Sequence, residues 1–235
     1  MKPLIIANWK SHNNLDQSLA WIEKVGPEIE KYPVDLVVCP SFLAIVSLKN
    51  QISSKNFKIF LGAQDVSAFA EGAYTGGVGA QLLAGLAKFC IVGHSERKRY
   101  FRETAQDIAG KLDQLLTVGI TPILCLSSSE ELDEYLAASG EIIEKADKII
   151  FVAEPAEAIS AGATFKPYDP DAAASLISKI EARIGKNVTS LYGGSVYAAN
   201  IAQFLSLRQI DGVLVGQSSV EPDNFLKLLN ALHRS

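Results

Sequence analysis

Eight short apolar runs recur along the chain and constrain its fold more than any other feature of the sequence. Most of the runs are continuously apolar rather than alternating in polarity, which is typical of parallel strands that are covered on both faces. Their mean spacing of about thirty residues is the length of one βαβ unit. The runs begin near Leu4, Asp35, Lys58, Phe89, Ile120, Lys148, Val188 and Asp211.

Amphipathic segments lie between the apolar runs and predict helices. Two of them open with a capping-box pattern, in which Asn14 precedes Gln17 and Thr104 precedes Asp107. Pro222 stands near the first turn of the last segment, a position that suits proline. The stripes of apolar residues at helical spacing begin at Leu15, Ile108, Leu176 and Phe225, and the first stripe extends to Ile29.

The repeated strand and helix units predict a single α/β domain over residues 1–235. A parallel sheet of eight such units can close on itself and so remove its edge strands. The even spacing, the number of runs and the lack of a Pro- or Ser-rich linker favour this closed (β/α)8 barrel. An open, doubly wound sheet is the structural alternative.

The composition argues against several classes of protein. The chain has 22 basic and 26 acidic residues, a net charge of −4, and no basic stripe of the kind that binds nucleic acid. The apolar run near Met1 is too short for a signal peptide or a membrane span, so we expect a cytoplasmic protein without a membrane partner. The odd number of cysteines and the lack of a Cys-x-x-Cys pattern indicate buried free thiols rather than a metal site, at Cys39, Cys90 and Cys125.

Charged and polar residues follow directly on several predicted strands. Active sites of such barrels lie at the carboxyl ends of the strands, so these residues are candidates for chemistry. Lys10 follows the first strand and could bind an anionic substrate, or it could simply cover apolar surface with its stem. His94 follows the fourth strand, where Ser95 could cap a short helix whose positive end keeps the imidazole neutral. The alternative is a core histidine with satisfied nitrogens.

Glu154 ends the sixth run, which is rich in Ile, Phe and Val. Burial there would raise the pKa of the carboxyl group and make it a better proton acceptor near neutral pH. The alternative is a Glu that caps a helix or pairs with a Lys. The stretch between Pro155 and Pro167 is rich in Ala and has the length of a functional lid.

Small residues after the seventh and eighth runs predict a phosphate site. The segments Gly193-Gly194-Ser195 and Gly216-Gln217-Ser218 would let backbone N–H groups approach an anion closely. Either segment alone is ordinary turn material, but in barrels the loops after these two strands frequently bind phosphate together.

These motifs, in this order, resemble those of the triosephosphate isomerase family over essentially the whole chain. The resemblance implies a (β/α)8 TIM barrel that interconverts dihydroxyacetone phosphate and D-glyceraldehyde 3-phosphate through an enediolate, in glycolysis and gluconeogenesis, without a metal or an organic cofactor. The motifs are Asn8-Trp9-Lys10, Gly93-His94-Ser95-Glu96-Arg97, Glu154-Pro155, Tyr192-Gly193-Gly194-Ser195-Val196 and residues 211–216.

The resemblance also implies a role for each site residue. Glu154 would be the base and His94 would polarise the carbonyl through a neutral ring N–H, which are the roles already described for this family. Lys10 and Asn8 would stabilise negative charge, and Glu96 would support them. Phosphate would be held at Ser160, Gly194, Ser195, Gly216 and Gln217. The segment Ala73-Tyr74-Thr75-Gly76 resembles the family's intersubunit loop, which implies a homodimer with Tyr74, Thr75 and Gly76 in its interface.

The chain departs from the family's pattern around the substrate but keeps the catalytic groups. In the segment after Glu154, Glu157 stands where Trp is usual and the tip reads Ile159-Ser160-Ala161-Gly162. We expect an active isomerase that binds its phosphorylated substrate more weakly than is usual for the family. The alternatives are another barrel enzyme that acts on a phosphorylated sugar and a non-catalytic sugar-phosphate-binding barrel. Further departures are Gln217 for a Gly, Ser127-Ser128 for Gly-Glu, and Gly77 for an acidic residue that would pair with Arg97 across the interface.

Overall fold

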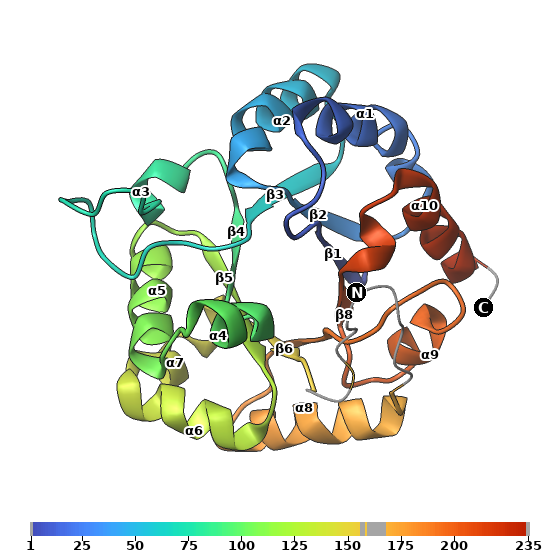
Figure 1. The fold of residues 1–235 in the computed structure, drawn as a ribbon. Helices are drawn as coiled ribbons and strands as arrows, with labels where there is room; N and C mark the ends of the chain where they lie inside the picture. Colours follow the sequence, from blue (N-terminus) through green and yellow to red (C-terminus); the bar gives the residue numbers. More distant parts are fainter. Residues whose placement is uncertain (1, 156–157, 159–167, 234–235) are drawn as a thin grey trace.

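The computed structural model describes residues 2–155, 158 and 168–233, which form eight parallel strands closed into a barrel (Figure 1). Each strand pairs with the next, and β8 returns to β1 with Leu4 opposite Gly212. The prediction of a closed barrel is therefore confirmed, and the open sheet is wrong. The strands are β1 (Leu4–Asn8), β2 (Asp35–Cys39), β3 (Ile59–Ala63), β4 (Phe89–Val92), β5 (Thr121–Leu126), β6 (Ile150–Ala153), β7 (Thr189–Tyr192) and β8 (Gly212–Val215).

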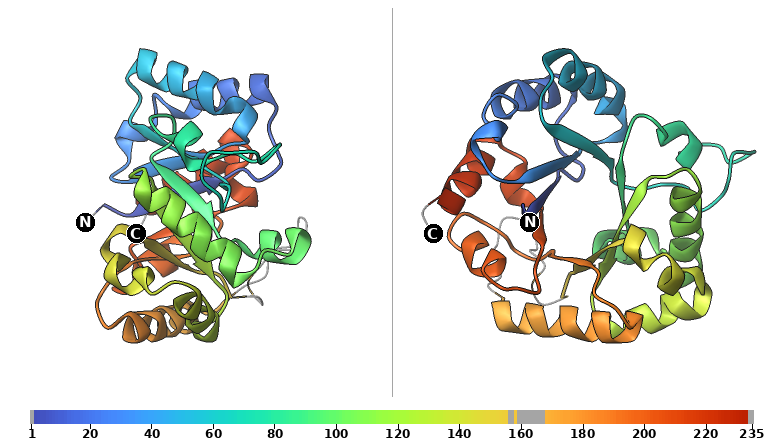
Figure 2. Two further views of the ribbon diagram at one scale, coloured as in Figure 1. Left: turned by 90° about the vertical axis from the view of Figure 1, so that its left-hand side faces the viewer. Right: turned by 180° about the vertical axis from the view of Figure 1, so that it is seen from behind.

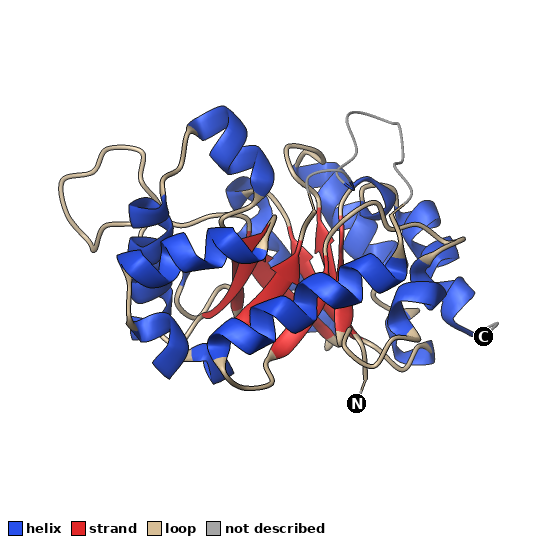
Figure 3. Ribbon diagram, turned by 90° about the horizontal axis from the view of Figure 1, so that it is seen from below, coloured by secondary structure: helices blue, strands red, loops and turns tan. Residues whose placement is uncertain are grey.

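The strands are enclosed by helices, which Figures 2 and 3 show around the central sheet. This arrangement explains why the apolar runs are continuous, since both faces of each strand are covered. The helices are α1 (Leu15–Val25), α2 (Phe42–Lys55), α3 (Ala80–Leu83), α4 (Ser95–Phe101), α5 (Ala105–Thr117), α6 (Ser129–Ala138), α7 (Glu141–Glu144), α8 (Pro170–Ile184), α9 (Ile201–Leu205) and α10 (Pro222–Asn230).

Alternate residues along the strands point into two different cores. One set fills the inside of the barrel with branched and sulfur-containing side chains, among them Ile6, Val37, Ile123 and Leu214. The other set packs outward against the helices, as Ile5 and Ala7 do in a cluster with Trp21 and Ile22 of α1. The inside of the barrel is therefore a packed core, and ligands can reach only its ends.

Local signals in the sequence set the ends of several helices. Asn14 and Gln17 exchange side-chain and backbone hydrogen bonds of 2.9 Å at the start of α1, as the capping-box pattern predicts. The expected extension of this helix to Ile29 is wrong, because α1 ends at Val25 and Ile29 begins a separate 3-10 turn. Pro27 follows closely and has no backbone N–H to continue the helix.

Cys39, Cys90 and Cys125 are buried free thiols, which confirms the prediction for these positions. Burial raises the pKa of all three thiols, so they stay protonated and unreactive near neutral pH. Among the described helices, none combines the length and the apolar character needed to cross a bilayer.

Candidate active site

Lys10, His94 and Glu154 follow β1, β4 and β6 and meet at the carboxyl end of the barrel. Lys10 Nζ lies 2.5 Å from Glu96 Oε1, and the other oxygen of Glu96 lies 3.8 Å from His94 Nδ1. His94 Nε2 in turn lies 3.1 Å from Glu154 Oε1. The structure therefore joins an ammonium group, an imidazole and a carboxylate in one chain of contacts, although they come from separate strands.

The backbone at Lys10 is strained and is held by neighbouring side chains. Its φ of 54° lies in the left-handed region, a backbone conformation that residues other than glycine rarely adopt. The N–H of Lys10 donates to Asn8 Oδ1 at 3.1 Å, and its carbonyl accepts a hydrogen bond of 2.8 Å from Gln64 Nε2. Gln64 also donates to Cys39 O at 2.9 Å, so the ends of β1, β2 and β3 fix the position of Lys10. Gln64 was not among the residues predicted from the sequence, although its place just after an apolar run could have indicated it.

His94 is the N-cap residue of α4, and its ring is 6% exposed. The expectation that Ser95 caps this helix is wrong, because the N–H of Glu96 donates to His94 Nδ1 at 3.2 Å while Ser95 is the first helical residue. A ring nitrogen that accepts a hydrogen bond carries no proton. Nε2, the nitrogen that faces Glu154, is therefore the ring nitrogen that carries a proton.

Glu154 is buried, and both of its oxygens have donors. Oε1 faces His94 Nε2, and Oε2 accepts a hydrogen bond of 3.1 Å from the N–H of Ser95. Burial acts to raise the pKa of Glu154, but His94, the Ser95 N–H and Lys98 outweigh it and lower the pKa below its ordinary value. The raised pKa predicted from the sequence is therefore wrong, because burial alone was considered and these donors lie far from Glu154 in the sequence. Glu154 is consequently ionised at neutral pH.

The loops after β7 and β8 lie together beside these groups. Ser218 Oγ donates to Val196 O at 2.8 Å and so joins the two loops. Gly216 leaves room for Lys10, because a β carbon at this position would lie 3.2 Å from Lys10 Cε. Gly194 is packed so tightly that a β carbon would lie 2.0 Å from the hydroxyl oxygen of Tyr192.

The predicted phosphate ligands differ in their present contacts. Ser195 is buried, and its N–H and hydroxyl both donate to the carbonyl of Ala158, at 3.0 and 2.9 Å. Gln217 is exposed and begins a 3-10 turn that runs to Ser219. The predicted ligand Ser160 lies outside the described residues. Glu157 and residues 159–162, where the sequence departs from the family pattern, also lie outside them. Within the described part of the chain, no group of three or more His, Cys, Asp or Glu residues is placed to hold a metal ion.

The sequence is similar to known proteins along nearly its full length. A model of the triosephosphate isomerase family matches residues 3–232. The chain belongs to the triosephosphate isomerase family. The triosephosphate isomerase of Thermus thermophilus is 36% identical, and the match covers 96% of this chain and 97% of that protein. Those of Mesomycoplasma hyorhinis and Alkalilimnicola ehrlichii are 35% and 32% identical, and each match covers at least 97% of both chains.

The segment that resembles the family's intersubunit loop lies between β3 and α3 and projects away from the barrel (Figure 1). Tyr74 is 48% exposed and stacks on Phe69 with ring centroids 4.6 Å apart. Gly76 has a φ of +84°, a conformation that favours glycine, and Thr75 between them is exposed. The three predicted interface residues therefore form a well-defined tip with access to solvent.

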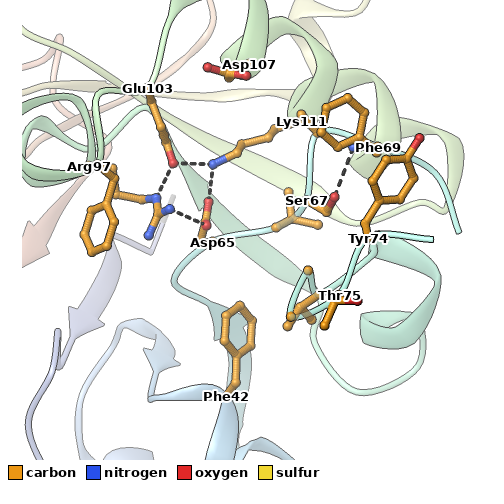
Figure 4. Close-up of a pocket in the computed structure, with 16 residues that line it drawn as sticks. Phe42, Asp65, Ser67, Phe69, Tyr74, Thr75, Arg97, Glu103, Asp107 and Lys111 are labelled. Carbon is orange, nitrogen blue, oxygen red and sulfur yellow. Dashed lines mark hydrogen bonds and ion pairs between the residues drawn. The ribbon is translucent and has the colours of Figure 1, made fainter. Parts of the chain in front are cut away.

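A cavity of about 540 Å³ lies beside this tip and has a floor of charged side chains (Figure 4). Arg97 Nη2 lies 2.8 Å from Asp65 Oδ2, and Lys111 Nζ lies 2.6 Å from Asp65 Oδ1. Glu103 contacts both cations and closes the ring. Arg97, which the family pattern would pair with an acid at position 77 across the interface, is thus neutralised within its own chain. This ring was not predicted from the sequence, because its members are far apart along the chain.

Proposed function

We propose that this chain interconverts dihydroxyacetone phosphate and D-glyceraldehyde 3-phosphate, with Glu154 as the base. Membership of the triosephosphate isomerase family supports the activity, and a triose phosphate substrate follows from it. The observation that carries the assignment of the residues is the continuous line of contacts from Lys10 through Glu96 and His94 to Glu154.

The proposed reaction moves one proton between two neighbouring carbons. The Glu154 carboxylate removes a proton from the hydroxyl-bearing carbon next to the carbonyl. The electron pair of that C–H bond forms a carbon–carbon double bond, and the π pair of the carbonyl moves onto its oxygen. The Nε2–H of His94 donates to that oxygen, while Lys10 and Asn8 stabilise the negative charge of the enediolate. His94 gives its Nε2 proton to that oxygen and takes the proton of the neighbouring hydroxyl, so the two oxygens exchange roles. Glu154 returns the first proton to the adjacent carbon as the new carbonyl forms. The carbonyl of the substrate accepts the electrons, so the reaction requires no cofactor.

Substrate would also change the basicity of Glu154. In the free protein the Nε2–H of His94 is directed at the carboxylate and lowers its pKa. A substrate carbonyl that takes this donor leaves Glu154 with burial as the dominant influence, which raises the pKa. The base would therefore become stronger when its substrate is in place.

Phosphate would bind at Gly194, Ser195, Gly216 and Gln217, beside Lys10. Support comes from the adjacent backbones of the two loops and from the space that Gly216 leaves. The N–H and hydroxyl of Ser195 now donate to Ala158 O, so they must leave this carbonyl before they can bind an anion.

Steady-state kinetics with both triose phosphates test this proposal, together with the substitution Glu154→Gln. We expect the wild-type chain to turn over both substrates. The substitution should lower kcat by about 10³-fold or more, because it removes the base, and should leave binding of a phosphate-bearing analogue largely intact. Wild-type turnover no faster than the buffer reaction would refute the activity and leave a non-catalytic sugar-phosphate-binding barrel.

We further propose that the chain forms a homodimer in the cytoplasm. Exposed apolar side chains line the cavity beside the Tyr74–Gly76 tip, which supports a covered surface; they are Phe42, Phe69, Tyr74 and Phe101. The buried free thiols suit a reducing compartment. Further exposed apolar residues include Leu43, Val46, Leu82 and Tyr100.

A further inference from the structure

Helix α4 carries the groups that face the base, yet packing alone does not hold it. His94 caps the helix and Ser95 begins it, and both contact Glu154. None of the residues described over Ser95–Phe101 is buried. A helix without a buried face depends on polar contacts for its position.

Three consecutive side chains of α4 form ion pairs with different parts of the barrel. Glu96 pairs with Lys10 after β1, and Arg97 pairs with Asp65 after β3. Lys98 pairs with Glu131 of α6. The contacts of Glu96 and Arg97 hold the helix toward the first half of the barrel, so Lys98 is the member of this run that ties it to the side of β5 and β6.

The contacts of Lys98 lead directly to the end of β5. Its ammonium group is paired with Glu131 Oε1 and lies 3.5 Å from both Ser127 Oγ and the hydroxyl oxygen of Tyr135. The other carboxylate oxygen of Glu131 accepts a hydrogen bond of 2.6 Å from the N–H of Ser127. The Lys98 and Glu131 side chains are only 19% and 17% exposed, so solvent weakens this pair less than it weakens a pair at the open surface.

Ser127 lies beside the base because of the register of the sheet. Leu126 is opposite Ala153 in the β5–β6 pair, so Ser127 and Glu154 are the next residues of the two strands. The N–H of Glu154 donates to Leu126 O at 2.7 Å. On the other side, the N–H of Lys98 donates to His94 O at 3.2 Å. A continuous series of contacts therefore runs from Glu154 through His94, Lys98 and Glu131 to Ser127, next to the residue that accepts the Glu154 N–H.

The charged and titratable groups around Glu154 come from several elements. His94 and Lys98 lie on the α4 side, and both favour the carboxylate. Cys125 of β5 is a buried thiol that stays protonated, and Gly193 on the β7 side brings no charge. Glu131 of α6 pairs with Lys98 and balances its charge.

We propose that Lys98 and Glu131 form a positioning pair for the isomerase reaction, which fixes α4 against the end of β5 so that His94 and Ser95 stay directed at Glu154. This inference rests on the proposed function, because it concerns the geometry of the same base. The pair itself does not touch the substrate. The segment Ser127-Ser128, which departs from the family pattern, holds Glu131 through two hydrogen bonds. The N–H of Ser127 donates to the Glu131 carboxylate, and the N–H of Glu131 donates to the Ser128 hydroxyl at 3.3 Å.

The test compares Lys98→Met and Lys98→Arg with the control Lys24→Met, which removes an exposed ion pair between α1 and α10. For Lys98→Met we expect kcat to fall about 10- to 100-fold, because the groups around the base lose their alignment. KM should change less than about 3-fold, because the phosphate loops are untouched. Lys98→Arg should recover most of kcat, and the control should match the wild type.

The pH dependence of kcat separates positioning of the base from a general loss of structure. We use kcat rather than kcat/KM because a phosphate monoester itself titrates at about pH 6. In Lys98→Met the acid limb should move to higher pH, since a cation that favours the ionised base is lost. In Glu131→Gln kcat should fall without a movement of the acid limb to higher pH, because Lys98 keeps its charge.

Three measurements decide the proposal: kcat, the position of the acid limb and the melting temperature of the Lys98→Met variant. A Lys98→Met variant with wild-type kcat and acid limb would show that the pair does not position the base. A lower kcat with an unmoved acid limb and a lower melting temperature would assign Lys98 a structural role alone. An inactive wild-type chain would instead refute the proposed function, so the two failures are distinguishable.

Discussion

At the residue scale, the state of Glu154 depends on a balance between burial and hydrogen-bond donors. Burial favours the protonated acid, whereas His94, the Ser95 N–H and Lys98 favour the carboxylate and prevail. A carboxyl group whose pKa is lowered on folding stabilises the protein above its unfolded pKa. That stabilisation is lost as the pH falls through the folded-state pKa, which lies below 4.5.

The substitution Glu154→Gln should make this dependence visible in unfolding experiments. A glutamine offers one acceptor where the carboxylate offers two, so His94 or Ser95 loses a partner, which costs about 1–3 kcal/mol at pH 7. We expect the wild type to be more stable than the variant at neutral pH, and the difference to shrink as the pH falls below 4.5. Urea unfolding at a series of pH values measures both. A difference that grows on acidification would contradict the lowered pKa.

The sequence located the main groups of the site but not their partners. Lys10, His94 and Glu154 could be found because each directly follows an apolar run. Their hydrogen bonds could not, because the Ser95 N–H and Glu154 are 59 positions apart in the sequence. The cap of α4 was also misassigned, since serine is the commoner cap and only the fold shows that the His94 ring reaches the N–H of Glu96.

At the scale of elements, the barrel follows from local patterns, whereas the ties between its elements do not. Continuous apolar runs and capping boxes predicted the strands and several helix starts, because these signals are local. The ring of Asp65, Arg97, Glu103 and Lys111 joins β3, α4 and α5 and has no local pattern. Its two cations and two carboxylates belong to one chain, so we expect its loss to lower the free energy of unfolding of the single subunit.

The substitution Lys111→Met tests the role of the ring. Lys111 is 6% exposed, and its removal leaves the carboxylates of Asp65 and Glu103 with one cation between them. We expect the free energy of unfolding to fall by about 3 kcal/mol, since unpaired buried charge is strongly destabilising. The control Lys145→Met removes the exposed pair with Glu141 and should leave stability unchanged. Equal stability of both variants in urea unfolding would show that the ring contributes little.

At the scale of the whole molecule, the exposed apolar surface around the Tyr74–Gly76 tip supports the proposed dimer. Phe69, Tyr74 and Phe101 are 53%, 48% and 66% exposed, and each lines the cavity of about 540 Å³, which is open to a partner. Its floor is already neutral, because Arg97 is paired with Asp65 and Glu103. An uncharged tip such as Tyr74-Thr75-Gly76 is therefore a suitable occupant, and a second copy of the chain supplies one.

The substitution Thr75→Arg should separate the proposed dimer. Thr75 is exposed at the tip, so an arginine there is tolerated in one subunit but would bring a surplus charge into the neutral cavity of the other. In sedimentation we expect the wild type at twice the 25.3 kDa mass of the chain and the variant at that mass. Isomerase activity should fall at least about 10-fold, because the cavity that the tip would fill is lined by Arg97 of α4, the helix that positions His94. Thr117→Arg, at the exposed end of α5, is the matched control and should stay dimeric and active. A wild-type chain that sediments only at 25.3 kDa, or a Thr75→Arg variant that stays dimeric, would contradict the proposed interface.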